Sequence, residues 1–124
     1  MTILIAEDNQ LNQQLMSLYM KRLGWDYKVV GDGLQAVESC RQEAFDLILM
    51  DVDMPVLDGI EATRYIRLFN SYIPIIAITA YTDDSIRREV ESAGMNSFIA
   101  KPCSRNDIFT AVTACLETKG EKVA

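Results

Sequence analysis

The stretch Phe45–Gly59, FDLILMDVDMPVLDG, decides how the rest of the chain is interpreted. Residues 47–50 (LILM) carry no polar side chain, which is typical of a strand buried on both faces of a parallel sheet. Asp51 follows directly, and Pro55 with Asp58-Gly59 then turns the chain toward the next helix. Open α/β sheets bind ligands beyond the carboxyl ends of their strands, so we expect Asp51 to lie in a functional crevice.

Four further apolar runs flank this stretch and alternate with segments of helical spacing. We expect strands at Thr2–Ala6, Tyr27–Val30, Phe45–Asp51, Pro74–Thr79 and Ser97–Ala100. Each strand is followed by one helix, and crossovers between parallel strands are right-handed. The sequence therefore predicts an α/β fold, a flavodoxin-like doubly wound parallel sheet of five strands in the order 2-1-3-4-5 with five helices.

The apolar residues of each predicted helix are expected to face the sheet. The expected inward residues are Leu11, Leu15, Leu18 and Tyr19; Val37, Cys40 and Ala44; Ala62, Ile66 and Phe69; Ile86, Val90 and Ala93; and Ile108, Val112 and Cys115. Gly24 and Gly94 are expected to end the first and fourth helices. Ser104 and Asp107 have the spacing of a capping box that opens the last helix.

Length and charge limit the classes of function. The 124 residues are enough for one domain, which we assign to residues 1–118, with a C-terminal tail at residues 119–124. The formal net charge of −6 argues against direct binding of nucleic acid or of an anionic membrane. The sequence contains neither an apolar stretch of transmembrane length nor the charge pattern of a signal peptide, so we expect a cytoplasmic protein without a membrane segment.

Histidine is absent from the sequence, which excludes Ser-His-Asp hydrolysis, Cys-His nucleophile pairs and most zinc sites. The three cysteines, Cys40, Cys103 and Cys115, share no metal-ligand spacing, and we expect reduced thiols. Any chemistry must therefore use carboxylates, lysine, hydroxyl groups and the backbone.

Residues of this kind gather where the predicted strands end. They are Glu7 and Asp8, Asp51 and Asp53, Thr79, and Lys101. A cluster of carboxylates is costly without a cation, and hard oxygen ligands near a phosphate favour Mg²⁺. A carboxylate nucleophile, a metal, a lysine and a hydroxyl group together suit phosphoryl transfer. Taken singly, Glu7 and Asp8 also fit a helix cap, and Thr79 fits an ordinary strand position. Lys101 precedes Pro102, and an X-Pro bond at such a turn can be cis.

These motifs resemble the receiver domain of two-component response regulators from Thr2 to about Leu116. The matching pieces are Glu7-Asp8-Asn9, Met50-Asp51, Met54-Pro55, Asp58-Gly59, Thr79-Ala80 and Lys101-Pro102. Residues 7–13 (EDNQLNQ) and 50–59 (MDVDMPVLDG) look most like receivers attached to hybrid histidine kinases.

The resemblance implies that Asp51 is the phosphoacceptor and that the carboxylates of Glu7, Asp8 and Asp51 organise Mg²⁺ together with the backbone carbonyl of Asp53. It also implies that Thr79 and Lys101 hold the phosphoryl group. The phosphodonor would be the phosphohistidine of a histidine kinase or a histidine phosphotransfer domain. The chain would not be an enzyme, although it would assist its own phosphorylation and dephosphorylation.

The resemblance further implies a switch that couples Thr79 to an aromatic residue on the fifth strand. The family often has Tyr at this position, and this sequence has Phe98. A contact through a tyrosine hydroxyl is therefore excluded, whereas a change in the burial of the ring is not. The sequence does not identify the downstream protein.

Two alternatives remain at this point. Residues 31–36 (GDGLQA) fit the G-x-G-x-x-A pattern of a nucleotide-binding oxidoreductase, but they follow the second strand and leave Glu7, Asp8, Thr79 and Lys101 unexplained. The other alternative is an interaction module of the same fold that works without phosphorylation, which the intact acidic cluster disfavours.

Overall fold

The computed structural model describes the backbone of residues 1–123 and the side chains of residues 1–117. The strands are β1 (Thr2–Ala6), β2 (Asp26–Val30), β3 (Leu47–Asp51), β4 (Ile75–Thr79) and β5 (Ser97–Ala100). The helices are α1 (Gln10–Leu23), α2 (Gly33–Gln42), α3 (Gly59–Arg67), α4 (Asp84–Ala93) and α5 (Arg105–Val123). The parallel strands lie in the order β2-β1-β3-β4-β5, which confirms the predicted fold.

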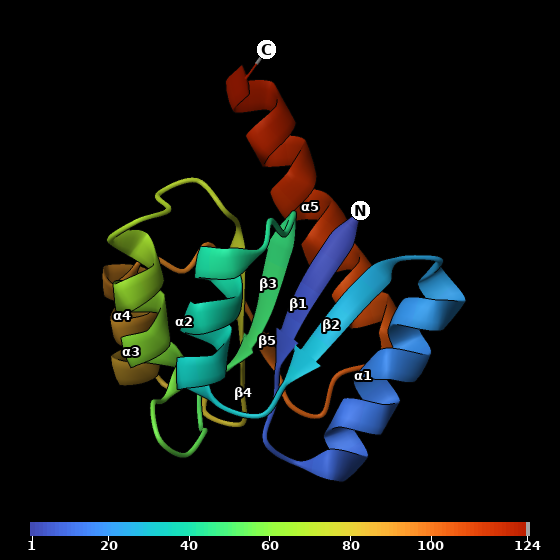
Figure 1. The fold of residues 1–124 in the computed structure, drawn as a ribbon, viewed down its shortest axis with the longest axis horizontal. Coiled ribbons are helices and arrows are strands. Elements are labelled where there is room, and N and C mark those ends of the chain that lie inside the picture. The colour runs from blue at the N-terminus through green and yellow to red at the C-terminus, as the bar shows by residue number, and fades with distance from the viewer. Residues whose placement is uncertain (124) are drawn as a thin grey trace.

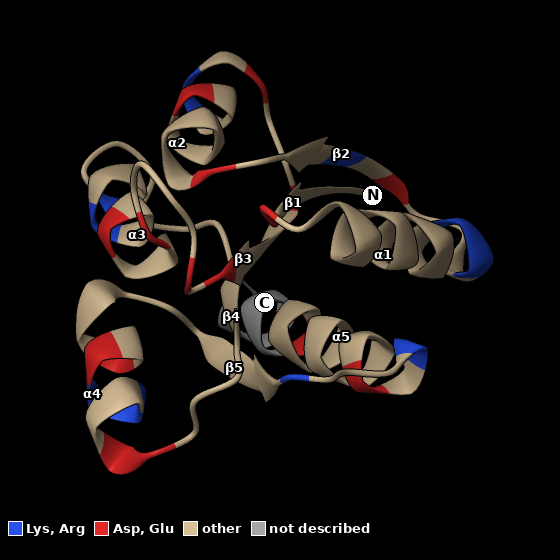
Figure 2. Ribbon diagram, turned by 90° about the horizontal axis from the view of Figure 1, so that it is seen from below, with Lys and Arg blue, Asp and Glu red and all other residues tan. Residues whose placement is uncertain are grey.

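Helices cover both faces of the sheet, with α1 and α5 on one side and α2, α3 and α4 on the other (Figures 1 and 2). Successive residues of a strand point to opposite faces, so β3 divides its side chains between two cores. Leu47 and Leu49 pack with Met20 of α1 and Ile108 of α5, whereas Ile48 and Met50 belong to the core beneath α2, α3 and α4. Every residue of β3 and β4 is buried, as expected for central strands.

The ends of several helices follow the predicted signals. Gly24 and Gly94 adopt the left-handed conformation, with φ of 77° and 101°, at the ends of α1 and α4. The amide of Ser104 donates to Asp107 Oδ2 at 2.9 Å and the amide of Asp107 donates to Ser104 Oγ at 3.1 Å, which is the predicted capping box. The Lys101–Pro102 peptide bond is cis.

The prediction that the leucines of α1 face the sheet is wrong. Leu11, Leu15 and Leu18 are 73%, 42% and 45% exposed, and the buried residues of the helix are Met16 and Met20. The helix carries two apolar stripes, and only the methionine stripe faces the sheet. The leucine stripe, meaning Leu11, Leu15 and Leu18, faces outward.

Two other predicted core residues are also exposed, namely Ala44 and Phe69. The physical reason is that α2 ends at Gln42 and α3 ends at Arg67, so helical spacing no longer decides where these two residues point.

The last helix passes the boundary that we placed at residue 118. The backbone of α5 is helical to Val123, and the side chains of residues 118–124 lie outside the described part of the structure. The division into a domain and a tail therefore stays a prediction. Among the described residues, no helix is both long and apolar enough to cross a membrane.

Candidate functional site

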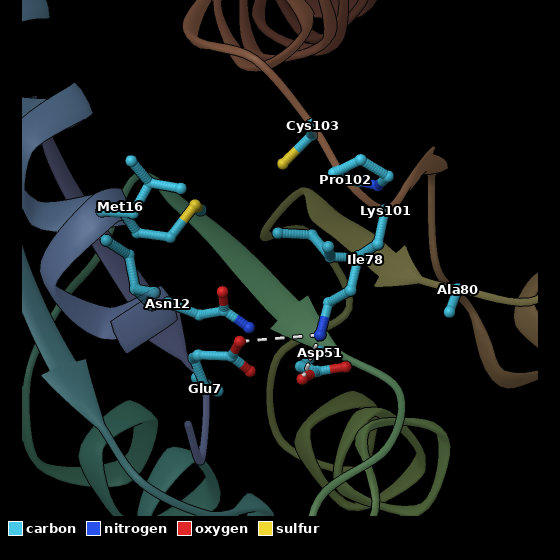
Figure 3. Close-up of a pocket in the computed structure, with 12 residues that line it drawn as sticks. Glu7, Asn12, Met16, Asp51, Ile78, Ala80, Lys101, Pro102 and Cys103 are labelled. Atoms are coloured by element: carbon cyan, nitrogen blue, oxygen red, sulfur yellow. Dashed lines mark hydrogen bonds and ion pairs between the residues drawn. The ribbon is translucent and has the colours of Figure 1, made fainter. Parts of the chain in front are cut away.

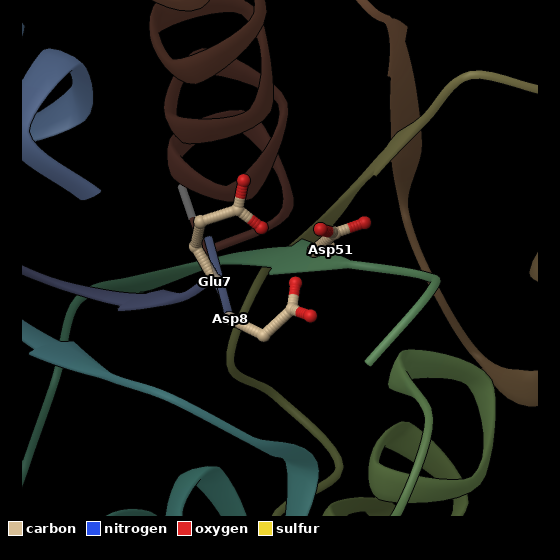
Figure 4. Close-up of side chains that lie close together, drawn as sticks. All are labelled: Glu7, Asp8 and Asp51. Carbon is tan, nitrogen blue, oxygen red and sulfur yellow. The ribbon is translucent and has the colours of Figure 1, made fainter. Parts of the chain in front are cut away.

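The carboxyl ends of β1 and β3 bring three carboxylates together. Glu7 follows β1 and Asp51 is the last residue of β3, and only 4% and 3% of their surfaces are exposed. Asp8 is exposed at the start of the loop that leads into α1. One carboxylate oxygen from each of Glu7, Asp8 and Asp51 lies within 4.8 Å of the other two. Figure 4 shows the three side chains gathered at this point.

Lys101 reaches this cluster from the end of β5. Its Nζ lies 2.8 Å from Asp51 Oδ2 and 3.5 Å from Glu7 Oε1 (Figure 3). Burial alone would lower the pKa of Lys101, but the hydrogen bond and the charge of Asp51, together with Glu7, raise it above the ordinary value. The ammonium group therefore stays charged while it faces two buried carboxylates.

Glu7 carries the largest electrostatic cost in the cluster. Its Oε2 is buried and has no hydrogen-bond partner among the described residues. The pKa of Glu7 is raised to about 7, first by burial and then by the hydrogen bond and negative charge of Asp51, while the charge of Lys101 opposes the rise. One lysine does not balance three carboxylates. An oxygen donor set with an unpartnered buried oxygen fits a hard divalent cation such as Mg²⁺.

Thr79 lies on β4, which is next to β3, and Phe98 lies on β5, which is next to β4. Asp51 pairs with Ile78 across the sheet, so Thr79 ends β4 one residue beyond the level of Asp51. Thr79 is buried, and its Oγ1 accepts a hydrogen bond from the amide of Tyr81 at 3.0 Å. Phe98 pairs with Ala77 on β4 and is half-buried. The guanidinium carbon of Arg87, on α4, lies 4.7 Å from the centre of the Phe98 ring.

The loop after β3 is held tightly around Asp51. The amide of Asp53 donates to Asp51 Oδ1 at 3.1 Å, and the amide of Gly59 donates to Val52 O at 2.9 Å. The Asp53 carboxylate is exposed and is not part of the acidic cluster. The structure therefore brings together the side chains of four predicted site residues, Glu7, Asp8, Asp51 and Lys101, and Thr79 ends the adjacent strand β4. The role predicted for the Asp53 carbonyl stays a prediction.

A cavity of about 400 Å³ opens beside the carboxylates. Leu15 and Met16 of α1, together with Pro102 and Cys103, form much of its wall, and Glu7, Asp51 and Lys101 lie at one end (Figure 3). Sequence reasoning missed Cys103 as a lining residue and placed Leu15 in the core. The cavity forms where α1 meets the segment after β5, and no local sequence pattern indicates that these two distant segments meet.

The glycine pattern at residues 31–36 has a structural explanation. A Cβ atom on Gly33 would lie 2.1 Å from the carbonyl oxygen of Leu57, and the amide of Gly33 donates to the same oxygen at 3.1 Å. The glycine allows two loops of the protein to approach each other, so the oxidoreductase alternative loses its main support.

Comparisons with known proteins agree with this geometry. A family model described as the response regulator receiver domain matches residues 3–113. Transcription factor SKN7 of Saccharomyces cerevisiae is 35% identical over 117 residues, which cover 94% of this chain and 19% of that protein. Hybrid signal transduction histidine kinase B of Dictyostelium discoideum is 37% identical over 120 residues, which cover 86% of this chain and 6% of that protein. The chain thus spans 19% or less of the length of these two relatives.

Two solved structures extend the comparison. The receiver domain of sensor histidine kinase PA1611 from Pseudomonas aeruginosa, solved with magnesium coordinated in its active site cleft, has a TM-score of 0.88 and 39% identity and covers 94% of this chain and 97% of its own. The receiver domain of Ssk1, in its complex with the histidine phosphotransfer protein Ypd1 from Saccharomyces cerevisiae, has a TM-score of 0.86 and 29% identity and covers 91% of this chain and 86% of the solved chain.

The resemblance seen in the sequence is confirmed, including the likeness to receivers of hybrid histidine kinases. The family match spans most of the chain, the fold has the predicted strand order, and histidine kinases are among the relatives. The chain therefore belongs to the response regulator receiver domain family and is a receiver domain of two-component phosphorelay signalling.

Proposed function

We propose that Asp51 accepts a phosphoryl group from a phosphohistidine on a partner protein. The observation that carries the proposal is the pairing of the buried Asp51 carboxylate with Lys101 Nζ at 2.8 Å, beside two further carboxylates. Asp51 alone among these three acids ends a fully buried central strand and contacts the lysine at hydrogen-bond distance.

In the proposed reaction, an Asp51 oxygen attacks phosphorus as the bond between phosphorus and the imidazole nitrogen breaks. The imidazole leaves with the electron pair of that bond and takes a proton from water. Lys101 Nζ moves from the carboxylate oxygen to a phosphoryl oxygen, and the hydroxyl group of Thr79 donates to another. Oγ1 of Thr79 now accepts from the Tyr81 amide, so its proton is free to be donated.

Glu7, Asp8 and Asp51, with the backbone carbonyl of Asp53, are the residues that would hold Mg²⁺. A bound Mg²⁺ supplies positive charge that offsets the charge of the phosphoryl oxygens. The buried and unpartnered Oε2 of Glu7 supports this set of ligands. The domain would be a phosphoacceptor that assists its own phosphorylation and later dephosphorylation, and it would not be a separate catalyst.

The phosphodonor would be a histidine kinase or a histidine phosphotransfer domain located in the cytoplasm. The leucine stripe of α1 supplies an apolar docking surface, because Leu15 both lines the cavity at Asp51 and is 42% exposed. A donor helix on this stripe would bring its histidine to the site. The downstream protein is not identified by these features.

Intact-mass measurement after incubation with acetyl phosphate and Mg²⁺ tests the proposal. We expect one added phosphoryl group on the wild type and none on Asp51→Asn. Asp53→Asn is the matched control, because it also removes one carboxylate two residues away, and it should still be labelled. Labelling of Asp51→Asn would contradict the assignment, and an unlabelled wild type would favour an interaction module that works without phosphorylation.

A further inference from the structure

The face formed by α2 and α3 exposes apolar residues that neither the sheet nor another helix covers. A cavity of about 490 Å³ lies on this face, and its wall consists of Leu34, Val37, Glu38, Arg41, Val56, Leu57 and Tyr65. The two helices lie side by side on the same side of the sheet (Figures 1 and 2). Apolar and aromatic walls of this kind occur at protein interfaces.

Val56 is the most unusual residue of this face. It is the one residue other than glycine with a positive φ in the described chain, at 69°, and it is 75% exposed. A β-branched residue in this conformation is strained. Because the side chain is exposed, no burial of apolar surface offsets that strain. The next residue, Leu57, accepts a hydrogen bond from Gly33 at the start of α2, which fixes Val56 beside the cavity. Val56 is therefore an exposed apolar residue at the wall of the cavity.

The charged residues of the face are one acid and one base on the same exposed side of α2. Glu38 and Arg41 are three residues apart, so they lie on adjacent turns of the helix surface. Glu38 forms neither a hydrogen bond nor an ion pair with any described residue, and Arg41 forms no ion pair there. The guanidinium carbon of Arg41 lies 4.9 Å from the centre of the Phe69 ring. The N–H groups at the edge of the guanidinium can still donate hydrogen bonds to a carboxylate.

We propose that this face binds a second copy of the same chain through a twofold interface. A twofold interface joins a surface patch to itself, so the patch must contain both members of every complementary pair. This patch contains an exposed apolar residue beside a hollow, Val56 and the cavity, and an acid and a base without an ion pair among the described residues, Glu38 and Arg41. Antiparallel packing of α2 against its copy places Glu38 of each chain opposite Arg41 of the other.

This dimer goes beyond the proposed phosphorylation, and it does not depend on it. The patch lies on the opposite face of the sheet from the leucine stripe of α1, which is the proposed donor surface. A dimer would therefore leave Asp51 open to the phosphodonor. The experiment uses unphosphorylated protein for this reason.

Sedimentation velocity across a wide range of concentration, up to several hundred micromolar, tests the proposal. We expect wild-type dimers, and we expect Glu38→Arg or Arg41→Glu alone to weaken dimerisation at least about tenfold, because each creates two like-charge contacts. An equimolar mixture of these two variants should form heterodimers, and the double variant should regain the wild-type dimer. Arg88→Glu and Glu89→Arg on α4 make the same charge changes elsewhere and should have no effect.

Val56→Asn separates docking from folding. Asparagine tolerates positive φ, so the variant should keep at least the wild-type stability toward urea while its dimer weakens. A wild type that stays monomeric throughout the range overturns the proposal. The proposal is also overturned if the charge reversals at residues 38 and 41 leave dimerisation unchanged. It is overturned as well if the two single variants do not associate with each other when mixed.

Discussion

At the scale of single residues, the site is built around a shortage of positive charge. Lys101 approaches both Glu7 and Asp51, but one ammonium group leaves a net negative charge among three carboxylates. Asp8 differs from its two neighbours because it is exposed and forms no ion pair with a lysine whose side chain the structure describes. The Asp8 carboxylate could therefore bind a metal ion without first giving up a contact with Lys101.

Replacement of Asp8 by Asn should weaken Mg²⁺ binding about tenfold or more, since the substitution removes one full charge from the ligand cluster. Isothermal titration calorimetry of the unphosphorylated protein measures the effect without any dependence on phosphoryl transfer. Asp53→Asn removes a carboxylate that lies outside the cluster and should bind Mg²⁺ nearly as the wild type does. Equal affinities in Asp8→Asn and the wild type would mean that Asp8 only favours the start of α1.

Tyr81 is placed to affect the lifetime of the phosphorylated form. Its amide donates a hydrogen bond to Thr79 Oγ1, and the residue is 57% exposed. Water must attack in line with the Asp51 oxygen, and a ring at the rim hinders that approach. Tyr81→Ala should therefore lose phosphate several-fold faster at the same Mg²⁺ concentration. Loss of mass after removal of the phosphodonor measures the rate, Tyr81→Phe serves as the control that keeps the ring, and an equal or slower rate in Tyr81→Ala rejects steric screening.

The sequence predicted which polar residues lie at the strand ends but not their physical states. The apolar run before Asp51 and the strand-end positions of Thr79 and Lys101 follow from strand patterns, because parallel strands end at one edge. No sequence pattern indicates that Glu7 is buried with an unpartnered oxygen while the adjacent Asp8 is exposed. That difference depends on side-chain direction at a loop, which only the folded chain determines.

At the scale of elements, a strand buried on two faces is easier to predict than a helix with two apolar stripes. In β3 every residue must be apolar up to Asp51, so the pattern has one interpretation. In α1 the leucine and methionine stripes both have helical spacing, and the sequence gives no reason why Met16 and Met20 face the sheet. The methionines share one core with Ile108 and Val112 of α5, which packs against the same face of the sheet.

Glycines join the elements at two kinds of position, and substitution should distinguish them. A Cβ on Gly59 would lie 2.1 Å from the carbonyl oxygen of Asp51, so Gly59→Ala must displace the backbone at the end of β3. We expect it to lower the free energy of unfolding by about 3 kcal/mol or more. A Cβ on Gly24 would have no described atom within 4 Å, so Gly24→Ala costs only the strain of a φ of 77°. We expect it to lower the free energy of unfolding by about 1 kcal/mol.

Urea unfolding followed by circular dichroism measures both free energies. Gly59→Ala should also reduce labelling of the folded fraction, because Asp51 moves, whereas Gly24→Ala should be labelled as the wild type is. Equal stability of the two variants would show that the loop after β3 relaxes without cost.

At the scale of the whole molecule, the sheet separates surfaces that can work independently. The carboxylates lie at the carboxyl edge, the leucine stripe lies on the α1 side, and the α2–α3 patch lies on the other side (Figure 2). The side of the sheet that carries α2, α3 and α4 also holds Phe98 beneath Arg87 of α4. Phosphorylation at the edge can therefore reach α4 through β4 and β5 without crossing the α1 side.

We expect phosphorylation to draw Thr79 toward the phosphoryl oxygens and to let the half-buried Phe98 turn inward, away from Arg87. Thr79 pairs with Ala100 and Ala77 pairs with Phe98, so a shift at the end of β4 acts two residues from the ring on the adjacent strand. Hydrogen exchange with acetyl phosphate and Mg²⁺ should change in residues 84–100 of the wild type. Thr79→Ala should be phosphorylated and show little of this change, whereas Thr79→Ser keeps the hydroxyl and should retain it. A full exchange response in phosphorylated Thr79→Ala would exclude Thr79 as the residue that links Asp51 to Phe98.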